Sequence, residues 1–170
     1  MAVRTISGIG SGGNTYVIRA SHDSWGDGIE SPSTPGGGDS PGLYREWTDQ
    51  FDAITSPGYL VAGGDAGNTI AQMTAQLPSV IAASPGATWG CLLGGLNDLY
   101  DDETAATIIA RMNAWIAAVG TTNQIICTIP PPFIAGARET VRDEVNNALR
   151  NGDFGASVRV VDLDVLLYNP

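Results

Sequence analysis

The sequence predicts a three-layer α/β sandwich built on a five-stranded parallel sheet. Short runs rich in β-branched and apolar residues alternate along the chain with segments whose apolar residues recur at helical spacing. Such alternation is typical of a parallel sheet with helices packed on it. Hydrophobic residues make up 43% of the 170 residues, while 22 glycines and 10 prolines supply turns. This length fits one domain with a substantial core.

Five runs are predicted as strands, in chain order 15–20, 58–62, 88–93, 124–129 and 157–162. The third run is apolar almost throughout, as expected of a strand that is buried on both faces of a sheet. A Gly/Ser-rich segment, residues 1–14, precedes the first strand, so the domain is expected to span residues 15–170.

Four helices are predicted, at about 43–53, from 68 to the residue before Pro78, from the acidic residues 101–103 to 119, and at 137–150. Pro78 is expected to end the second helix because proline has no N–H to donate and clashes with the preceding turn. The third helix is the clearest, since its apolar residues form one stripe. The stripe consists of Ile108, Met112, Trp115, Ile116 and Val119.

The charge balance excludes some partners. The 8 basic residues are all arginine, and against 18 acidic residues they leave a formal net charge of −10 and a pI near 4.2. A nucleic-acid binder needs a basic surface, which this chain lacks, and an anionic membrane would repel it. We expect neither nucleic acid nor membrane as a partner.

Targeting and cysteine signals are few. The first residues lack the apolar core of a secretory signal, and no run approaches the roughly 18 apolar residues of a membrane span. Cys91 and Cys127 each lie in an apolar run and are expected to be reduced, buried thiols. The cytoplasm is therefore the default compartment, with inclusion in a particle as the alternative.

Chemically useful residues follow the first three predicted strands. Ser24 comes after the first, Gly64 after the second and Asn97 after the third. Ligands of parallel sheets bind beyond the carboxyl ends of the strands, where these residues would meet. Ser24 could act as a nucleophile, while the Gly64 backbone N–H and the Asn97 amide could stabilise an oxyanion.

The same residues resemble a known family. Asp23-Ser24 with Gly28, then Gly64-x-x-Gly67-x-Thr69, then Gly95-x-Asn97-Asp98 look like the first three blocks of the SGNH (GDSL-type) hydrolases, in order. The resemblance implies a flavodoxin-like sandwich and ester hydrolysis through an acyl-enzyme, without cofactor or metal. It assigns Ser24 as nucleophile and oxyanion donor, with Gly64 and Asn97 completing the oxyanion hole.

Three departures from the family pattern concern the catalytic base and the final helix. The chain has a single histidine, His22, which stands where the first block normally has glycine. The family's Asp-x-x-His block is matched by Asp162-Leu163-Asp164-Val165, with valine in the place of the base, and the family's final helix is expected to be missing. His22 is either a substitute base for Ser24 or a turn residue, and Asp162 is either a triad member or a strand-end carboxylate with a structural hydrogen bond.

Two hypotheses on function follow. The first is an SGNH-type esterase that acts on acyl or O-acetyl esters, including acylated carbohydrates. The second is a catalytically impaired module that binds ligand or builds a homo-oligomer or a larger assembly, such as a virion surface. Between them stands an incomplete site, whose base comes from a neighbouring subunit or from a segment beyond Pro170.

Other candidates have simpler interpretations. Gly38-x-Ser40-x-Gly42 matches a nucleophile elbow in letters, but the Gly/Pro-rich run before it cannot be a central strand, so Ser40 is interpreted as a loop or cap residue. Trp25 either floors a substrate pocket or packs in its loop. The acidic residues between 98 and 103 could hold a cation, although negative charge at a helix start explains them more simply.

Overall fold

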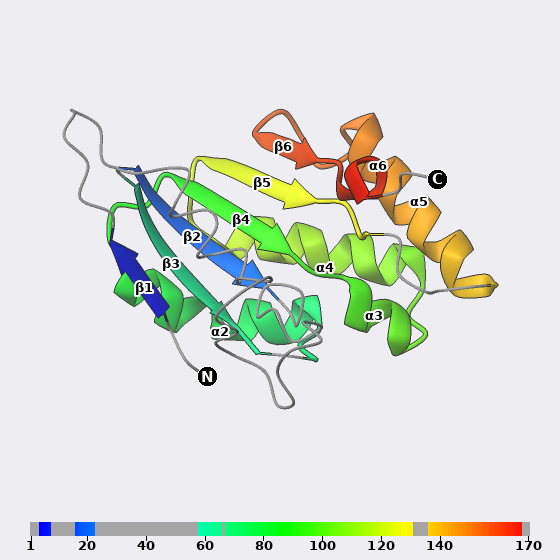
Figure 1. The fold of residues 1–170 in the computed structure, drawn as a ribbon, viewed down its shortest axis with the longest axis horizontal. Coiled ribbons are helices and arrows are strands. Elements are labelled where there is room, and N and C mark those ends of the chain that lie inside the picture. Colours follow the sequence, from blue (N-terminus) through cyan, green and yellow to red (C-terminus); the bar gives the residue numbers. More distant parts are fainter. Residues whose placement is uncertain (1–3, 8–15, 23–57, 66, 131–135, 168–170) are drawn as a thin grey trace.

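A computed structural model describes residues 4–7, 16–22, 58–65, 67–130 and 136–167. Its centre is a six-stranded sheet in the order β1-β3-β2-β4-β5-β6 (Figure 1). The strands are β1 (Arg4–Ser7), β2 (Tyr16–His22), β3 (Gly58–Gly64), β4 (Trp89–Leu93), β5 (Asn123–Cys127) and β6 (Val158–Val161). β2 to β6 run parallel and correspond to the five strands expected from the sequence. The α/β fold with a parallel sheet is thereby confirmed.

β1 is an addition to the predicted sheet. It lies in the N-terminal segment 1–14 and pairs antiparallel with β3, from Arg4 opposite Ala62 to Ser7 opposite Tyr59. Four residues beside a Gly/Ser-rich stretch carry too little pattern to stand out in a sequence. Pairing with β3 gives them their strand conformation.

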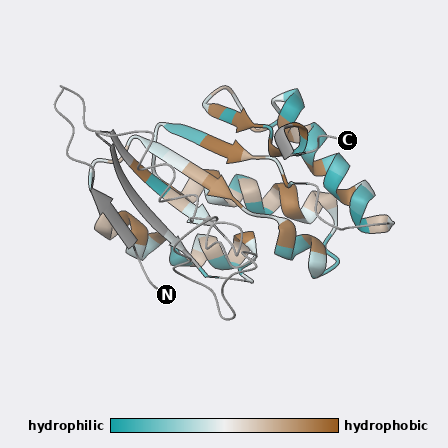
Figure 2. Cartoon of the chain, in the orientation of Figure 1, coloured by the Kyte–Doolittle hydropathy of each residue, from teal (hydrophilic) through white to brown (hydrophobic). Residues whose placement is uncertain are grey.

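Five helices are described: α2 (Ile70–Ala83), α3 (Leu96–Tyr100), α4 (Ala105–Ala118), α5 (Ala137–Asn151) and α6 (Leu163–Leu167). Leu92 of β4 and Ile126 of β5 belong to one buried cluster with residues of α2, α4 and α5, so these helices cover the same face of the sheet. Figure 1 shows α2 and α4 passing behind the strands. Figure 2 shows hydrophobic residues along β4 and β5 and a largely hydrophilic α5.

The expected stripe on α4 is confirmed. Ile108, Met112 and Trp115 are fully buried, and Ile116 packs against the cluster from a partly buried position. The helix begins later than the acidic residues suggested, because Thr104 caps it by accepting the N–H of Thr107 at 3.2 Å. The separate short helix α3 precedes it.

The expected end of the second helix before Pro78 is wrong. α2 continues through Pro78 to Ala83. Pro78 itself is exposed, whereas Leu77 before it and Val80 after it are buried in the core. Burial of these two side chains on one helix face outweighs the single hydrogen bond that proline removes.

The other face of the sheet carries a smaller apolar cluster, formed by Ile18, Ala20 and Cys91. Both Cys91 and Cys127 are free and buried, which confirms the expected reduced thiols. Within the described residues, no helix has the length and apolar character needed to cross a membrane.

Candidate active site

The sheet order brings three strand ends together at one edge. β2 lies between β3 and β4, and the register sets His22 opposite both Gly64 of β3 and Leu93 of β4. The segment that leads from β4 into α3 begins one residue beyond Leu93. His22, Gly64 and the residues that lead to Asn97 therefore share the carboxyl edge of the sheet, where ligands of parallel sheets bind.

The turn between β4 and α3 requires Gly95, and Gly94 leaves room for the flexible end of the Met73 side chain. Gly95 has φ +107°, a backbone conformation that residues with a Cβ rarely adopt, and a Cβ there would lie 2.8 Å from Ile129 Cδ1. A Cβ on Gly94 would lie 2.4 Å from Met73 Cε. The glycine pair therefore lets the chain turn tightly against the core, so that α3 starts at once and carries Asn97 at its second position.

Asn97 is held by a backbone group of the neighbouring segment. Its side-chain Nδ2 donates to the carbonyl oxygen of Asn68 at 3.0 Å, and the residue is half-buried. A primary amide carries two N–H groups, and this bond uses one of them. The second N–H of a fixed, neutral amide is suited to binding a developing negative charge.

Asp98 connects the same helix to two neighbouring elements. The residue is fully buried, and its Oδ2 accepts the N–H of Ile70 at 3.0 Å. Its Oδ1 accepts from Arg111 Nη1 at 2.7 Å, and Arg111 Nη2 reaches Glu103 at 2.5 Å. The hydrogen bond to Asp98 is the main cause of a raised pKa for Arg111. α3 is thereby connected to the start of α2 and to α4.

A glycine that the sequence analysis gave no role lies next to this amide. Gly67 is exposed with φ +83°, and it directly precedes Asn68, the residue that Asn97 binds. Gly64 ends β3 three residues earlier. The signal for Gly67 in the sequence is its place in the second block of the resemblance, Gly64-x-x-Gly67-x-Thr69, just before the capping pair Thr69 and Gln72.

Several predicted residues lie outside the described part of the chain. These are Ser24 and its neighbour Trp25, the alternative serine Ser40, and the helix expected at 43–53. His22 is described as the last residue of β2, through its backbone pairing. The roles of Ser24 and His22 remain predictions from the sequence.

The fourth block of the resemblance is occupied by an ion-pair network between α5 and α6. Asp162 accepts from Arg150 Nε and Nη2 at 2.8 and 2.9 Å, and from the Thr128 hydroxyl at 3.1 Å. The Arg150 hydrogen bond is the main reason why the pKa of Asp162 is lowered. This arrangement is that of a strand-end carboxylate with structural hydrogen bonds, one of the two interpretations that the sequence left open.

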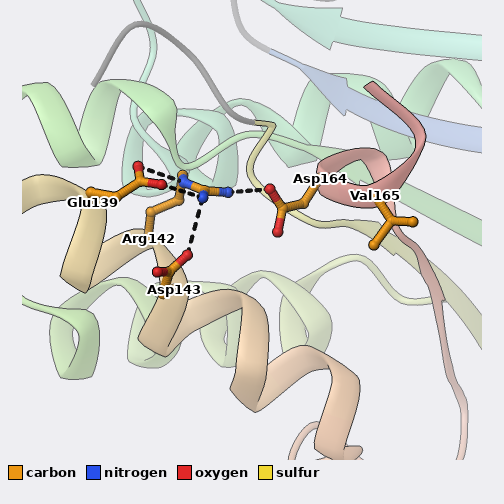
Figure 3. A pocket seen from close by; sticks show the side chains of 5 residues that line it. All are labelled: Glu139, Arg142, Asp143, Asp164 and Val165. Carbon is orange, nitrogen blue, oxygen red and sulfur yellow. Dashed lines mark hydrogen bonds and ion pairs between the residues drawn. The ribbon is translucent and has the colours of Figure 1, made fainter. Parts of the chain in front are cut away.

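Asp164 completes the network and borders a cavity of about 430 Å³. It accepts from Arg142 Nη1 at 2.5 Å and from Arg150 Nη2 at 2.6 Å. Figure 3 shows Glu139, Asp143 and Asp164 converging on the Arg142 guanidinium, with Val165 beyond Asp164. Val165, at the position of the family's base, is 66% exposed.

The sequence predicts that the family's final helix is missing. In the structure, a short helix, α6, follows β6. It is a helix of five residues, Leu163–Leu167, and side-chain oxygens support its start. Asp162 Oδ1 accepts the N–H of Val165 at 3.3 Å, and the Thr128 hydroxyl accepts the N–H of Asp164 at 3.0 Å. Asp162 is a local cap that precedes the helix in the sequence, whereas Thr128, which follows β5, is a tertiary acceptor that the sequence does not display.

The acidic residues between 98 and 103 bind arginines. Asp98 and Glu103 pair with Arg111, and Asp102 pairs with Arg138 at 2.7 Å. Among the described residues, no three histidine, cysteine or acidic side chains are grouped so that they could hold a metal ion.

Comparison with known proteins shows which fold this chain shares. No family model matches the sequence, and no curated protein sequence matches it. Among solved structures, it is similar to AlinE4, an SGNH-hydrolase family esterase, with 15% identity, 94% of this chain and 82% of that chain covered, and a TM-score of 0.66. It is also similar to a member of the lipolytic protein G-D-S-L family from Veillonella parvula DSM 2008, with 15% identity, 91% and 81% coverage, and a TM-score of 0.71.

A third similar structure is TesA, at 16% identity, covering 84% of this chain and 76% of that chain, with a TM-score of 0.60. The protein therefore has the fold of the SGNH hydrolases, as its motifs led us to expect. Identities of this size show the fold and leave the chemistry to be argued from this chain's own residues.

Proposed function

We propose that the protein is an SGNH-type serine ester hydrolase that acts on acyl or O-acetyl esters, acylated carbohydrates among them. The observation that carries the proposal is the Asn97 amide at the carboxyl edge of the sheet, which is fixed against Asn68 and, among the described residues, uses one of its two N–H groups in that bond. This edge includes the end of β2, two residues before Ser24. An oriented amide donor close in the chain to a serine is suited to acyl transfer.

In the proposed reaction, the Ser24 hydroxyl oxygen attacks the ester carbonyl carbon and its proton passes to a base. The carbonyl oxygen becomes an oxyanion, which accepts hydrogen bonds from the Asn97 amide and from the backbone N–H groups of Ser24 and Gly64. Collapse expels the alcohol, which takes the proton from the base, and leaves Ser24 acylated. Water then attacks the acyl-enzyme by the same route and releases the acid.

Gly67 competes with Gly64 for the role of backbone donor. It adjoins the segment to which Asn97 is bonded, and its positive φ turns the backbone sharply just before α2. Alanine at either position keeps the backbone N–H but displaces it or blocks the approach of the substrate. The variant at the donor position should therefore show the larger loss of kcat. Gly67→Ala is strained in any case by its φ, so its unfolding must be measured in parallel.

His22 is the proposed base. Backbone pairing sets it between Gly64 and Leu93, and it precedes Ser24 by two residues. Asp162 has its oxygens bound by Arg150 and Thr128, and Val165 has no ionisable group. If His22 is the base, kcat/KM should rise with pH through the range of histidine, around pH 6.5, and His22→Gln should abolish that rise.

The test of the function is hydrolysis of p-nitrophenyl acetate together with labelling by a serine-directed phosphonate. Wild-type protein should turn over the ester and gain one phosphonyl group by mass. Ser24→Ala should lose labelling and at least about a thousandfold in kcat, since the remaining groups act only on binding and charge. Ser40→Ala is the matched control and should behave as wild type. Wild-type protein that neither hydrolyses the ester nor takes the label contradicts the proposal.

The alternative is a module that keeps the scaffold without turnover and binds ligand or assembles with other copies. The observation that favours it is the ion-pair network at the fourth block, where arginine holds the carboxylate and valine stands in the place of the base. In that case wild-type protein remains unlabelled, and sedimentation shows a stable oligomer or calorimetry shows binding of an acetylated oligosaccharide without its hydrolysis.

A further inference from the structure

A chain of side chains connects α4 to the amide of Asn97. Arg111, on α4, binds the fully buried Asp98 at 2.7 Å with one arm and Glu103 at 2.5 Å with the other. Asp98 directly follows Asn97 on α3, a helix of only five residues. So short a helix has little stability of its own, and its position depends on the contacts that hold it.

Two of those contacts join α3 to the start of α2. The Asp98 carboxylate accepts the N–H of Ile70, the first residue of α2, and the Asn97 amide donates to the carbonyl of Asn68 two residues earlier. Both bonds therefore join α3 to the same short stretch of chain. A displacement of the α3 backbone at Asp98 would therefore also displace the adjacent Asn97.

Arg111 supplies the countercharge on which this arrangement depends. A carboxylate that is removed from water is strongly unfavourable unless it is paired and hydrogen-bonded. Among the described residues, Arg111 is the cation that contacts Asp98. Without it, the Asp98 carboxylate would lack its countercharge in a buried position and would turn toward water, which would weaken its bond to Ile70.

We propose that Arg111 is a positioning residue for the Asn97 amide. Acting through Asp98, it keeps α3 in register with residues 68–70, so that the second N–H of Asn97 has a fixed orientation for the oxyanion. This inference rests on the proposed hydrolase, and it adds to the site a residue of α4 that lies 14 positions along the chain from Asn97.

The test compares Arg111→Met with Arg159→Met in the full chain. Arg159 is an exposed arginine on β6 and serves as the control. Arg138 is not used as a control because it donates to the carbonyl of Tyr100 at the end of α3 at 3.1 Å. The first readout needs no activity: the side-chain amide resonances of Asn97 and the hydrogen-exchange protection of the Ile70 amide. Arg111→Met should shift those resonances and lower the protection at least about tenfold, whereas Arg159→Met should change neither.

The second readout is the split between kcat and KM for p-nitrophenyl acetate. A misoriented donor weakens the transition state and not the ground-state complex, so Arg111→Met should lower kcat about 10- to 100-fold with KM within about twofold. Arg111→Lys keeps a cation opposite Asp98 without the two-armed contact, and it should recover part of the loss. The lysine variant also replaces Arg111→Met if the latter does not fold.

Two outcomes overturn the role of Arg111. One is an unchanged Asn97 amide and unchanged Ile70 protection, which decides against the proposal whether or not the protein hydrolyses esters. The other is lowered protection with unchanged kcat, because the contact would then be structural only. An inert wild-type protein contradicts the proposed hydrolase instead, and the amide measurement still decides whether Arg111 positions Asn97.

Discussion

Arg19 is a buried cation whose acceptors are neutral oxygens. Only 6% of the residue is exposed, and burial lowers the pKa of its guanidinium. It donates to the hydroxyl and carbonyl of Ser84 at 2.8 and 2.9 Å, and to the carbonyls of Val119 and Gly120 at 2.7 and 3.1 Å. Ser84 and Val119 are the C-caps of α2 and α4, so one guanidinium serves the negative ends of two helix dipoles.

Replacing Arg19 by methionine should lower the free energy of unfolding by about 2–4 kcal/mol, because it leaves several helix-end carbonyls buried without donors. Urea unfolding followed by circular dichroism measures the change. Arg159→Met, at an exposed position on β6, is the control and should stay within about 0.5 kcal/mol of wild type. Equal stability of the two variants would contradict this account of Arg19.

At the scale of elements, α2 contains a proline that its packing tolerates. Pro78 is exposed in the middle of the helix, and its ring leaves the carbonyl four residues before it without the usual donor. The prediction is that Pro78→Ala raises the free energy of unfolding by about 1–2 kcal/mol, since the regained helix hydrogen bond exceeds the added entropy of the unfolded chain. Ser79→Ala, at the next exposed position, should change stability by less. A loss of stability in Pro78→Ala would show that the helix requires a bend at this point.

The docking of α6 should depend on pH. The hydrogen bond from Arg150 is the main cause of the lowered pKa of Asp162. Burial raises the pKa of Asp164, but the hydrogen bonds that Asp164 accepts from Arg150 and Arg142 outweigh burial and leave its pKa below the usual value. A carboxyl group with a lowered pKa in the folded state stabilises the fold above its ordinary pKa of about 4 and loses this effect as the pH falls through the folded value. α6 should therefore loosen as the pH falls below about 4.

Hydrogen exchange and the chemical shift of the Val165 amide, which donates to Asp162, would follow this transition. Arg150→Met should move its midpoint toward higher pH, because the pKa of Asp162 then approaches that of a free carboxyl group. A Val165 amide signal that is the same from pH 6 to pH 2 would contradict the view that the ion pairs of Asp162 and Asp164 hold α6 in place.

At the scale of the whole molecule, the two thiols report on the integrity of the sheet. Cys91 on β4 and Cys127 on β5 are both buried, and the hydrogen bond between them, followed by burial, raises the pKa of Cys91. Neither strand is at an edge of the sheet. Under native conditions both thiols should resist a thiol reagent, and in urea both should react in the same transition that circular dichroism detects. Rapid labelling of one thiol in the native protein would instead show local opening of that part of the sheet.

The order of strands and helices along the chain was predictable from the local sequence pattern. Runs such as 88–93 are apolar on both faces, and the stripe from Ile108 to Val119 recurs at helical spacing, so each shows its own conformation and its burial. The residues that follow strands could be assigned to one edge of the sheet, because parallel strands present their carboxyl ends together. Asn97 was found in this way.

What lay beyond prediction depends on partners far apart in the chain. Asp98 meets Ile70, 28 residues away, and Arg19 meets Val119, 100 residues away. Pro78 stays in its helix because Leu77 and Val80 are buried by other elements, and β1 exists because β3 offers it an edge. None of these contacts leaves a periodic signal.

By itself, then, the sequence determined the succession of strands and helices, the acidic surplus and the motifs that resemble those of the SGNH hydrolases. These are properties of neighbouring residues, set by propensity and hydrophobic spacing. Only the tertiary structure decided that Arg111 pairs with Asp98 beside Asn97. It also decided that Arg142 and Arg150 form ion pairs with the carboxylates of the fourth block, Asp164 and Asp162. Burial makes an unpaired charge unfavourable, and the fold alone determines which partner is near enough to neutralise it.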